Sequence, residues 1–135
     1  MTLRISLRDG EKMVVNGAVL RSVGRTDLAI DSKAAILRGR EVMAPEEADT
    51  PARQLYFHTM MAYIDPDGSA GHQDRIIRSL QEVAALLPSD EARALAASFA
   101  RHAAGLHYYR ALGDCRGLIR LESEALAEVR EQAAA

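Results

Sequence analysis

The sequence is poor in cysteine, proline and aromatic residues, and it contains no tryptophan. Its one cysteine, Cys115, excludes an internal disulfide framework and a zinc site built on several thiolates. No apolar run approaches the roughly 20 residues that a membrane-spanning helix requires. The opening residues alternate in polarity instead of forming an apolar signal-peptide core. We therefore expect a cytoplasmic protein with no membrane contact.

The residues that are present indicate a folded chain with an uneven distribution of charge. Of the 135 residues, 48% are apolar and 27% are charged, which is typical of one globular domain or two small lobes. The net charge of −2 by itself argues against a nucleic-acid-binding protein. However, residues 1–42 hold eight basic and five acidic side chains, a net of +3, and the remainder holds nine and fourteen, a net of −5. This asymmetry indicates that the two parts have different partners.

The first third of the chain predicts short antiparallel strands. Residues 3–7 alternate apolar and polar side chains, as does a strand with one buried face. Asn16-Gly17 is the strongest hairpin signal, because both central residues of a type I′ turn need a positive φ. The predicted strands span residues 3–7, 12–15, 18–23, 28–30 and 34–38, with 41–43 as an optional continuation of the fifth strand after an interruption at Gly39. Because this sheet has few residues to bury, we expect it to pack on the helices or on a second copy of itself.

The rest of the chain predicts helices. Thr50-Pro51 is a good helix start, since the hydroxyl is an N-cap and proline suits the first turn. In the second predicted helix, Ile76, Ile77 and Val83 belong to one apolar stripe. The predicted helices span about 51–64, from after residue 69 to 87, 89–105, and from 106 onward. We therefore predict an α+β fold: a small N-terminal antiparallel β-sheet or roll in residues 1–43, followed by a bundle of about four helices in residues 44–135, together forming one compact unit.

The last predicted helix is apolar on two sides. One seam is formed by Tyr108, Leu112, Cys115, Ile119, Leu126 and Val129, with Glu122 interrupting it. Leu118 and Leu121 add a second stripe. A helix of this kind is either central to a bundle or supplies a dimer interface. The candidate partner or dimer residues are Tyr108, Leu112, Leu118 and Leu121.

Residue patterns that support catalysis or metal binding are weak. The sequence has no Gly-rich phosphate loop, nucleophile elbow or HExxH motif. The histidines His58, His72, His102 and His107 lack the spacing of a shared metal site, so ordinary surface or core roles are favoured. Cys115 on the seam is better explained as a buried, unreactive thiol than as a nucleophile. We predict no catalytic residue, metal or cofactor, and therefore no enzyme.

Arginines are the remaining candidate binding groups. The candidates for RNA contact are Arg4, Arg8, Arg21, Arg25, Arg38 and Arg40. Together they would follow a phosphate backbone, although an arginine-rich face that only maintains solubility is the plainer interpretation of composition alone. Every aromatic residue lies outside the predicted strands, which excludes a sheet that stacks bases on aromatic rings. RNA recognition would therefore use arginines, backbone groups and strand edges.

Several blocks of sequence resemble the FlbT family of flagellar regulators. They are residues 10–19 (GEKMVVNGAV), 33–38 (KAAILR), 43–57 (MAPEEADTPARQLYF) and 108–112 (YYRAL). The resemblance is collinear over nearly the whole chain. It implies a post-transcriptional regulator that binds the 5′ untranslated leader of flagellin mRNA and promotes its degradation, with some members acting as activators. It also implies a FlaF-type regulator as a partner in the same circuit.

The order of the predicted strands is also similar to that of CsrA-type RNA-binding proteins. These are dimers of interleaved strands that hold RNA leaders with arginines on their first and last strands. The analogy favours Arg4 and Arg8 on the first strand, and Arg38 and Arg40 on the last, and it implies a homodimer.

Two functions of different classes follow. The first is an RNA-binding repressor whose sheet contacts the flagellin leader. The alternative is a protein-interaction module that holds FlaF, or flagellin itself, and acts on the message only indirectly. The predicted hairpin of the last two helices faintly resembles one tetratricopeptide unit, although a single unit cannot form an array.

Overall fold

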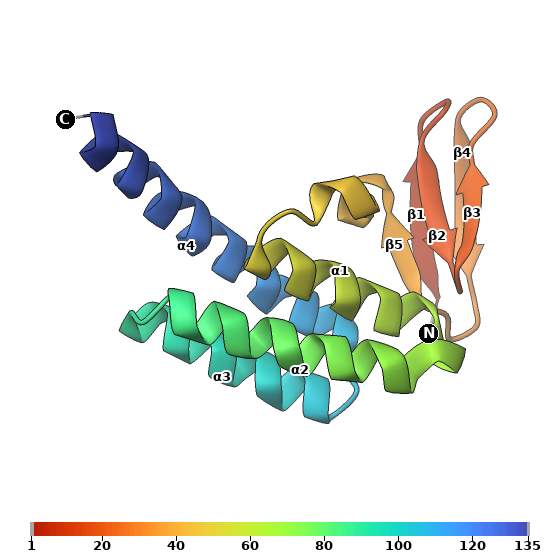
Figure 1. Ribbon diagram of the computed structural model, residues 1–135. Helices are drawn as coiled ribbons and strands as arrows, with labels where there is room; N and C mark the ends of the chain where they lie inside the picture. Colours follow the sequence, from red (N-terminus) through yellow and green to blue (C-terminus); the bar gives the residue numbers. More distant parts are fainter. Residues whose placement is uncertain (1, 135) are drawn as a thin grey trace. The chain divides into compact units, whose positions relative to one another are not determined.

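The computed structural model describes residues 2–134 and divides the chain into two units. The first contains the strands, up to Val42, together with Ile64–Pro66, and the second contains Met43–Tyr63 and the residues from Asp67 onward. Figure 1 shows the strands in red to orange and the helices in yellow to blue. The predicted fold class, antiparallel strands followed by four helices, is confirmed.

The strands form two small antiparallel sheets. The strands are β1 (Leu3–Leu7), β2 (Lys12–Val15), β3 (Ala18–Arg21), β4 (Thr26–Ile30) and β5 (Ile36–Arg38). One sheet pairs β1 with β4, and the other has the order β3-β2-β5. Asn16 and Gly17 have φ values of 50° and 86°, as the predicted type I′ turn requires. This two-residue turn sets Val15 opposite Ala18 and Lys12 opposite Arg21.

The core of the strand unit lies between the two sheets. Ile5 and Leu7 of β1 form a buried cluster with Met13 of β2, and half-buried apolar residues of both sheets pack around it. The alternation seen in the sequence of β1 thus gives one buried face and one exposed face. The optional continuation of the fifth strand over residues 41–43 is wrong, because Gly39–Glu41 forms a 3-10 turn, η1, in which Glu41 accepts from the Arg38 N–H at 2.9 Å.

Four helices make up most of the second unit: α1 (Pro51–Ile64), α2 (Ser69–Leu86), α3 (Asp90–Ala104) and α4 (Tyr108–Ala134). Short 3-10 turns, η2 (Pro45–Glu47) and η3 (Pro66–Gly68), precede α1 and α2. Ser89 caps α3 as the sequence predicts, since its hydroxyl accepts from the Ala92 N–H at 3.2 Å. Gly117 allows α3 and α4 to approach closely, because a Cβ there would lie 2.9 Å from Leu95 Cδ1.

The N-terminus of α1 is held by a residue far away in the sequence. Glu122 of α4 is only 6% exposed, and its Oε2 accepts from the Ala52 N–H at 2.9 Å. Its other carboxylate oxygen accepts from the Thr50 hydroxyl. A negative charge on the free N–H groups at the start of a helix is favourable, because it meets the positive end of the helix dipole. Glu122, the one polar residue in the apolar seam of α4, therefore caps the N-terminus of α1.

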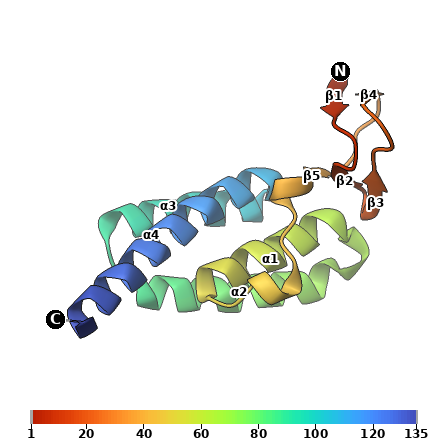
Figure 2. The same cartoon turned by 90° about the horizontal axis from the view of Figure 1, so that it is seen from above.

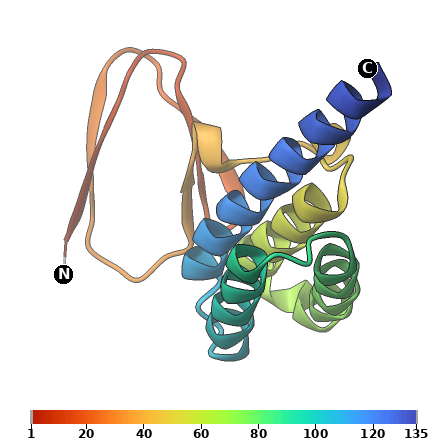
Figure 3. The same ribbon diagram turned by 90° about the vertical axis from the view of Figure 1, so that its left-hand side faces the viewer.

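Two predicted apolar stripes differ from the observed buried faces. In α2 the buried residues are His72, Ile76, Ser79 and Val83, while Ile77 is exposed. In α4 the seam is buried only as far as Glu122, and Leu126 and Val129 are exposed. Figures 2 and 3 show the C-terminal turns of α4 extending past the other helices. Among the described residues, no other helix covers the side chains of Leu126 and Val129.

Candidate functional site

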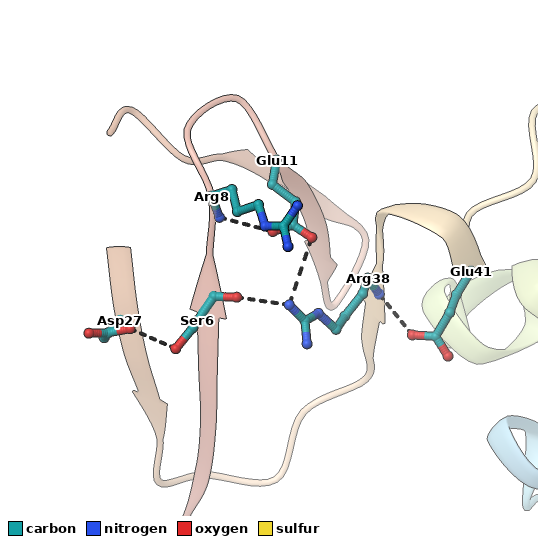
Figure 4. A network of polar contacts seen from close by, with 6 residues as sticks. All are labelled: Ser6, Arg8, Glu11, Asp27, Arg38 and Glu41. Carbon is teal, nitrogen blue, oxygen red and sulfur yellow. Dashed lines mark hydrogen bonds and ion pairs between the residues drawn. The ribbon is translucent and has the colours of Figure 1, made fainter. Parts of the chain in front are cut away.

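Arg4 and Arg8 lie in and directly after β1, one of the two strands of the β1–β4 sheet. They alternate along the chain with Ile5 and Leu7, which point into the core. Ser6 lies between them, on the same face as Arg4, and its hydroxyl donates to Asp27 Oδ1 of β4 at 2.7 Å (Figure 4). Arg4 thus lies on the exposed face of β1, and Arg8 follows directly after the strand, with its side chain directed toward Glu11 in Figure 4.

Arg21 lies on a different face. In the β2–β3 hairpin it stands directly opposite Lys12, and both side chains are exposed. By strand alternation these two cations share the side of Val14 and Val19, which is opposite to the side on which Met13 joins the core. Arg21 and Lys12 therefore occupy the side of the three-stranded sheet that faces away from the β1–β4 sheet.

Arg38 already has contacts within the strand unit. One of its guanidinium nitrogens, Nη2, donates to the Ser6 carbonyl oxygen at 2.8 Å and lies 3.7 Å from Glu11 Oε2. Glu11 in turn accepts from the Arg8 N–H at 2.9 Å, as Figure 4 shows. The Arg38 side chain thus links β5 to β1 across the two sheets. Its first role is to join the sheets, and it is less free for a ligand than the other candidates.

Arg25 and Arg40 are exposed and lie outside the strands. Arg25 follows the turn at Gly24, and Arg40 lies in η1. The six predicted arginines consequently do not form one continuous stripe. Arg4 lies on one face, Arg21 lies on another, and Arg38 bridges the sheets.

The acidic side chains of the strand unit are bound mainly by neutral donors. Asp9 accepts from the Gly24 N–H at 2.8 Å, and Asp31 accepts from the Thr2 hydroxyl at 2.9 Å. Asp27, Glu11 and Glu41 accept from a hydroxyl or a backbone N–H in the same way. Among residues 2–42, the cations that make no ion pair are Arg4, Arg8, Lys12, Arg21, Arg25, Lys33 and Arg40. The strand unit thus presents a surplus of unneutralised positive charge.

Lys12 is a cation that the sequence-based selection of arginines missed. The signal was present, because a two-residue turn at Asn16-Gly17 fixes the register and sets Lys12 opposite Arg21. Like charges directly opposite each other on neighbouring strands repel. An anion bound between them would relieve this repulsion.

The helical candidates for a partner interface lie mostly inside the second unit. Tyr108, Leu112 and Leu118 are buried there, and Leu121 is half-buried. Packing within a single chain therefore accounts for the burial of the first three. A homodimer stays a prediction, and these three side chains do not support it.

Two histidines of the helical unit have defined surroundings. His102 Nδ1 and Asp114 Oδ2 lie 2.8 Å apart and link α3 to α4. Burial lowers the pKa of His58, and the positive charge of Arg75 lowers it further. Within residues 2–134 there is no group of three or more histidine, cysteine and acidic side chains placed to hold a metal ion. No helix in that range is long and apolar enough to span a bilayer.

Cys115 offers a direct check of the packing of α4. It is fully buried, and burial raises the pKa of its thiol above the ordinary value. Because the thiolate is the reactive form, we expect Ellman's reagent to label the native protein at least about 100-fold more slowly than the protein in urea. Labelling that is equally fast in both conditions would show that the thiol is accessible.

These features define a class: a small α+β protein with a cationic strand unit and an acidic helical unit. The model of the family described as "Flagellar protein FlbT" matches residues 3–126. The chain belongs to the FlbT family. No solved structure matches the chain.

Curated relatives are similar over nearly the whole chain. The flagellum biosynthesis repressor protein FlbT of Caulobacter vibrioides is 35% identical over 130 residues, covering 96% of this chain and 92% of the relative. The probable repressor FlbT of Caulobacter sp. strain K31 is 33% identical, with 96% and 99% covered. That of Allorhizobium ampelinum is 34% identical over 125 residues, with 93% and 84% covered. The family is one of regulatory repressors rather than enzymes.

Proposed function

We propose that this protein is a post-transcriptional regulator of flagellin synthesis that binds the 5′ untranslated leader of flagellin mRNA and promotes its degradation. Membership of a family of flagellum biosynthesis repressors supports the regulatory role. The single observation that carries the RNA contact is the set of seven cations without an ion pair on the strand unit, where residues 1–42 carry a net charge of +3. Neutral donors occupy the acidic side chains nearby, so these cations are free to meet phosphate groups.

The physical mechanism of binding is electrostatic. Each lysine or arginine that meets a phosphate releases condensed counterions, so affinity falls as the salt concentration rises. Arginine also offers a planar fork of donors that matches two phosphate oxygens. The strands carry no aromatic side chain, so stacking of bases on the sheet makes no contribution. Recognition of the leader sequence falls to arginine forks and to backbone groups at the strand edges.

A titration of purified protein with labelled leader RNA tests this function. If about three phosphates are contacted, the dissociation constant rises about 10- to 30-fold between 50 and 200 mM salt. Arg78→Ala, which removes an exposed arginine of α2, is the matched control and leaves affinity unchanged. Equal affinity at the two salt concentrations, or equal affinity for a scrambled RNA, would contradict the proposal.

The alternative function is a protein-interaction module that holds a FlaF-type regulator or flagellin. The observation that favours it is the exposed apolar side chains on the helical unit. Leu126 and Val129 continue the seam of α4 past its last buried position, and Leu106 is exposed with a φ of 61°. The positive φ of Leu106 ends α3, because the His107 N–H donates back to the His102 carbonyl at 2.8 Å, and this turn leaves the Leu106 side chain exposed. Protein that fails to bind leader RNA but co-purifies with FlaF or flagellin would establish this alternative instead.

A further inference from the structure

Strand β3 is an open edge of the three-stranded sheet. It is hydrogen-bonded to β2 on one side, and the sheet ends there. All four of its residues are exposed, including Val19 at 67% and Leu20 at 44%. Val23, just beyond the strand, is 85% exposed. Apolar side chains in such a position are unusual, because proteins normally protect edge strands.

The backbone of β3 divides its hydrogen bonds between two sides. Ser22 N donates to the Glu11 carbonyl at 2.9 Å, and the Ser22 carbonyl accepts from Gly10 N at 2.8 Å, so Ser22 points toward β2. The bonding direction of the backbone alternates along an antiparallel strand. The N–H and C=O groups of Leu20 therefore also point toward β2. The N–H and C=O groups of Val19 and Arg21 therefore point outward, and no residue in the described range 2–134 pairs with them.

The usual devices that block an edge are missing from β3. It has no proline and no inward-pointing charge, and its single charged residue, Arg21, stands at its end. The bulge of this hairpin, Gly10 and Glu11 opposite Ser22, lies beyond the end of β3 and on the partner strand. Outward backbone groups and exposed β-branched or apolar side chains together form a template for another strand. The strand is four residues long, so the contact that it offers is small.

We propose that β3 pairs with β3 of a second copy of this chain, in an antiparallel register centred on Leu20. In this register Val19 of one copy lies opposite Arg21 of the other, so that each outward N–H and C=O meets a partner. Leu20 packs against its own counterpart on the two-fold axis. The two three-stranded sheets thereby become one continuous sheet of six strands.

The alternation of backbone bonding selects this register among the possible ones. Only registers that place outward-bonding residues opposite each other satisfy both strands. Centring on Arg21 would set two arginines directly opposite each other, which is unfavourable. Centring on Val19 would bring Arg21 opposite Gly17 in the turn and leave its bonds strained. The strand is thus complementary to itself in one arrangement, and an unrelated peptide is not needed to explain the exposed edge.

The paired sheet places Lys12 and Arg21 of both copies on one face. These four cations repel one another, and the contact is short, so the dimer belongs to the small, transient class of interfaces. Phosphate groups bound across this face would relieve the repulsion and strengthen the dimer. Only the strengthening of the dimer by bound phosphate groups rests on the proposed function, because pairing of the strands requires no RNA.

Sedimentation equilibrium of the full chain without RNA, up to about 1 mM protein, tests the pairing. Val19→Pro removes an outward N–H and leaves the bonds to β2 intact, whereas Val19→Ala keeps that donor and is the matched control. We expect a concentration-dependent dimer for the wild type and for Val19→Ala, and a dimer at least about tenfold weaker for Val19→Pro. A wild type that stays monomeric, or a Val19→Pro variant that dimerises as well as Val19→Ala, overturns the proposal.

A charge exchange at the two-fold axis tests the register and does not depend on the fold of the proline variant. Leu20→Lys and Leu20→Glu each place like charges opposite each other, so each variant alone is expected to be monomeric. Mixed in equal amounts, they are expected to form a heterodimer. A mixture that stays monomeric while the wild type dimerises overturns the register centred on Leu20. Because none of these measurements contains RNA, their failure is distinguishable from failure of the leader-binding function.

Discussion

Glu122→Ala is expected to lower the free energy of unfolding of the helical unit by about 2–4 kcal/mol, because it strips a cap from a buried helix end. The Ala52 N–H and the Thr50 hydroxyl both donate to this carboxylate. Ala52 is fully buried, so water cannot replace the lost acceptor. A buried donor without a partner loses most of its solvation energy, and a cavity at position 122 adds to that loss.

Urea unfolding followed by circular dichroism at 222 nm measures this effect. Glu124→Ala is the matched control, since it removes an exposed glutamate two residues away that pairs only with Arg120. We expect that control to change stability by less than about 0.5 kcal/mol. Glu122→Gln is expected to fall between the two, because its amide oxygen still accepts one hydrogen bond. Equal stability of the Glu122→Ala and Glu124→Ala variants would show that the cap contributes nothing.

Removing Lys12 and Arg21 together is expected to weaken binding of the leader RNA by about 20- to 100-fold at 100 mM salt. These two cations stand directly opposite each other on neighbouring strands, and neither makes an ion pair. Arg4→Ala with Arg8→Ala is expected to weaken binding less, by about 3- to 10-fold, because the carboxylate of Asp27, held by Ser6 on the same strand pair, lowers the positive potential there. The dependence of affinity on salt concentration is expected to decrease most in the variant that lacks Lys12 and Arg21.

We measure the affinity for leader RNA, and its dependence on salt concentration, for each double variant. The comparison of the two shows which face of the strand unit contacts the RNA. Arg38→Ala is unsuitable as a probe, because it also removes the contacts with Ser6 and Glu11 that join the sheets. A larger loss for Arg4→Ala with Arg8→Ala would place the RNA on the β1–β4 sheet instead. No loss for either double variant would refute contact through the strands.

Local signals in the sequence were sufficient for most of the secondary structure. Asn16-Gly17 specifies its own turn because few other residue pairs adopt two successive positive φ values. Thr50-Pro51 and Ser89 mark helix starts because their side chains meet the needs of the first turn. The false strand segment at 41–43 arose because the short apolar pair Val42-Met43 is compatible with several conformations.

Packing partners were less predictable from local pattern. The apolar stripe of α2 included Ile77, yet the buried face is rotated toward His72 and Ser79. The seam of α4 continued to Val129 in the sequence, although burial ends at Glu122. A periodic pattern predicts which side of a helix is apolar, but it does not predict how far the neighbouring helices extend along that side.

The sequence by itself determined the family, the order of the elements, the register of the β2–β3 hairpin and the surplus of positive charge in the first third. Each of these depends on neighbouring residues or on composition, which the chain carries before it folds. Tertiary structure alone decided that Glu122 caps α1, that Arg38 joins the two sheets and that Arg4 and Arg21 lie on different faces. Those outcomes depend on contacts between residues distant in the sequence, and the packing of side chains in three dimensions selects those contacts.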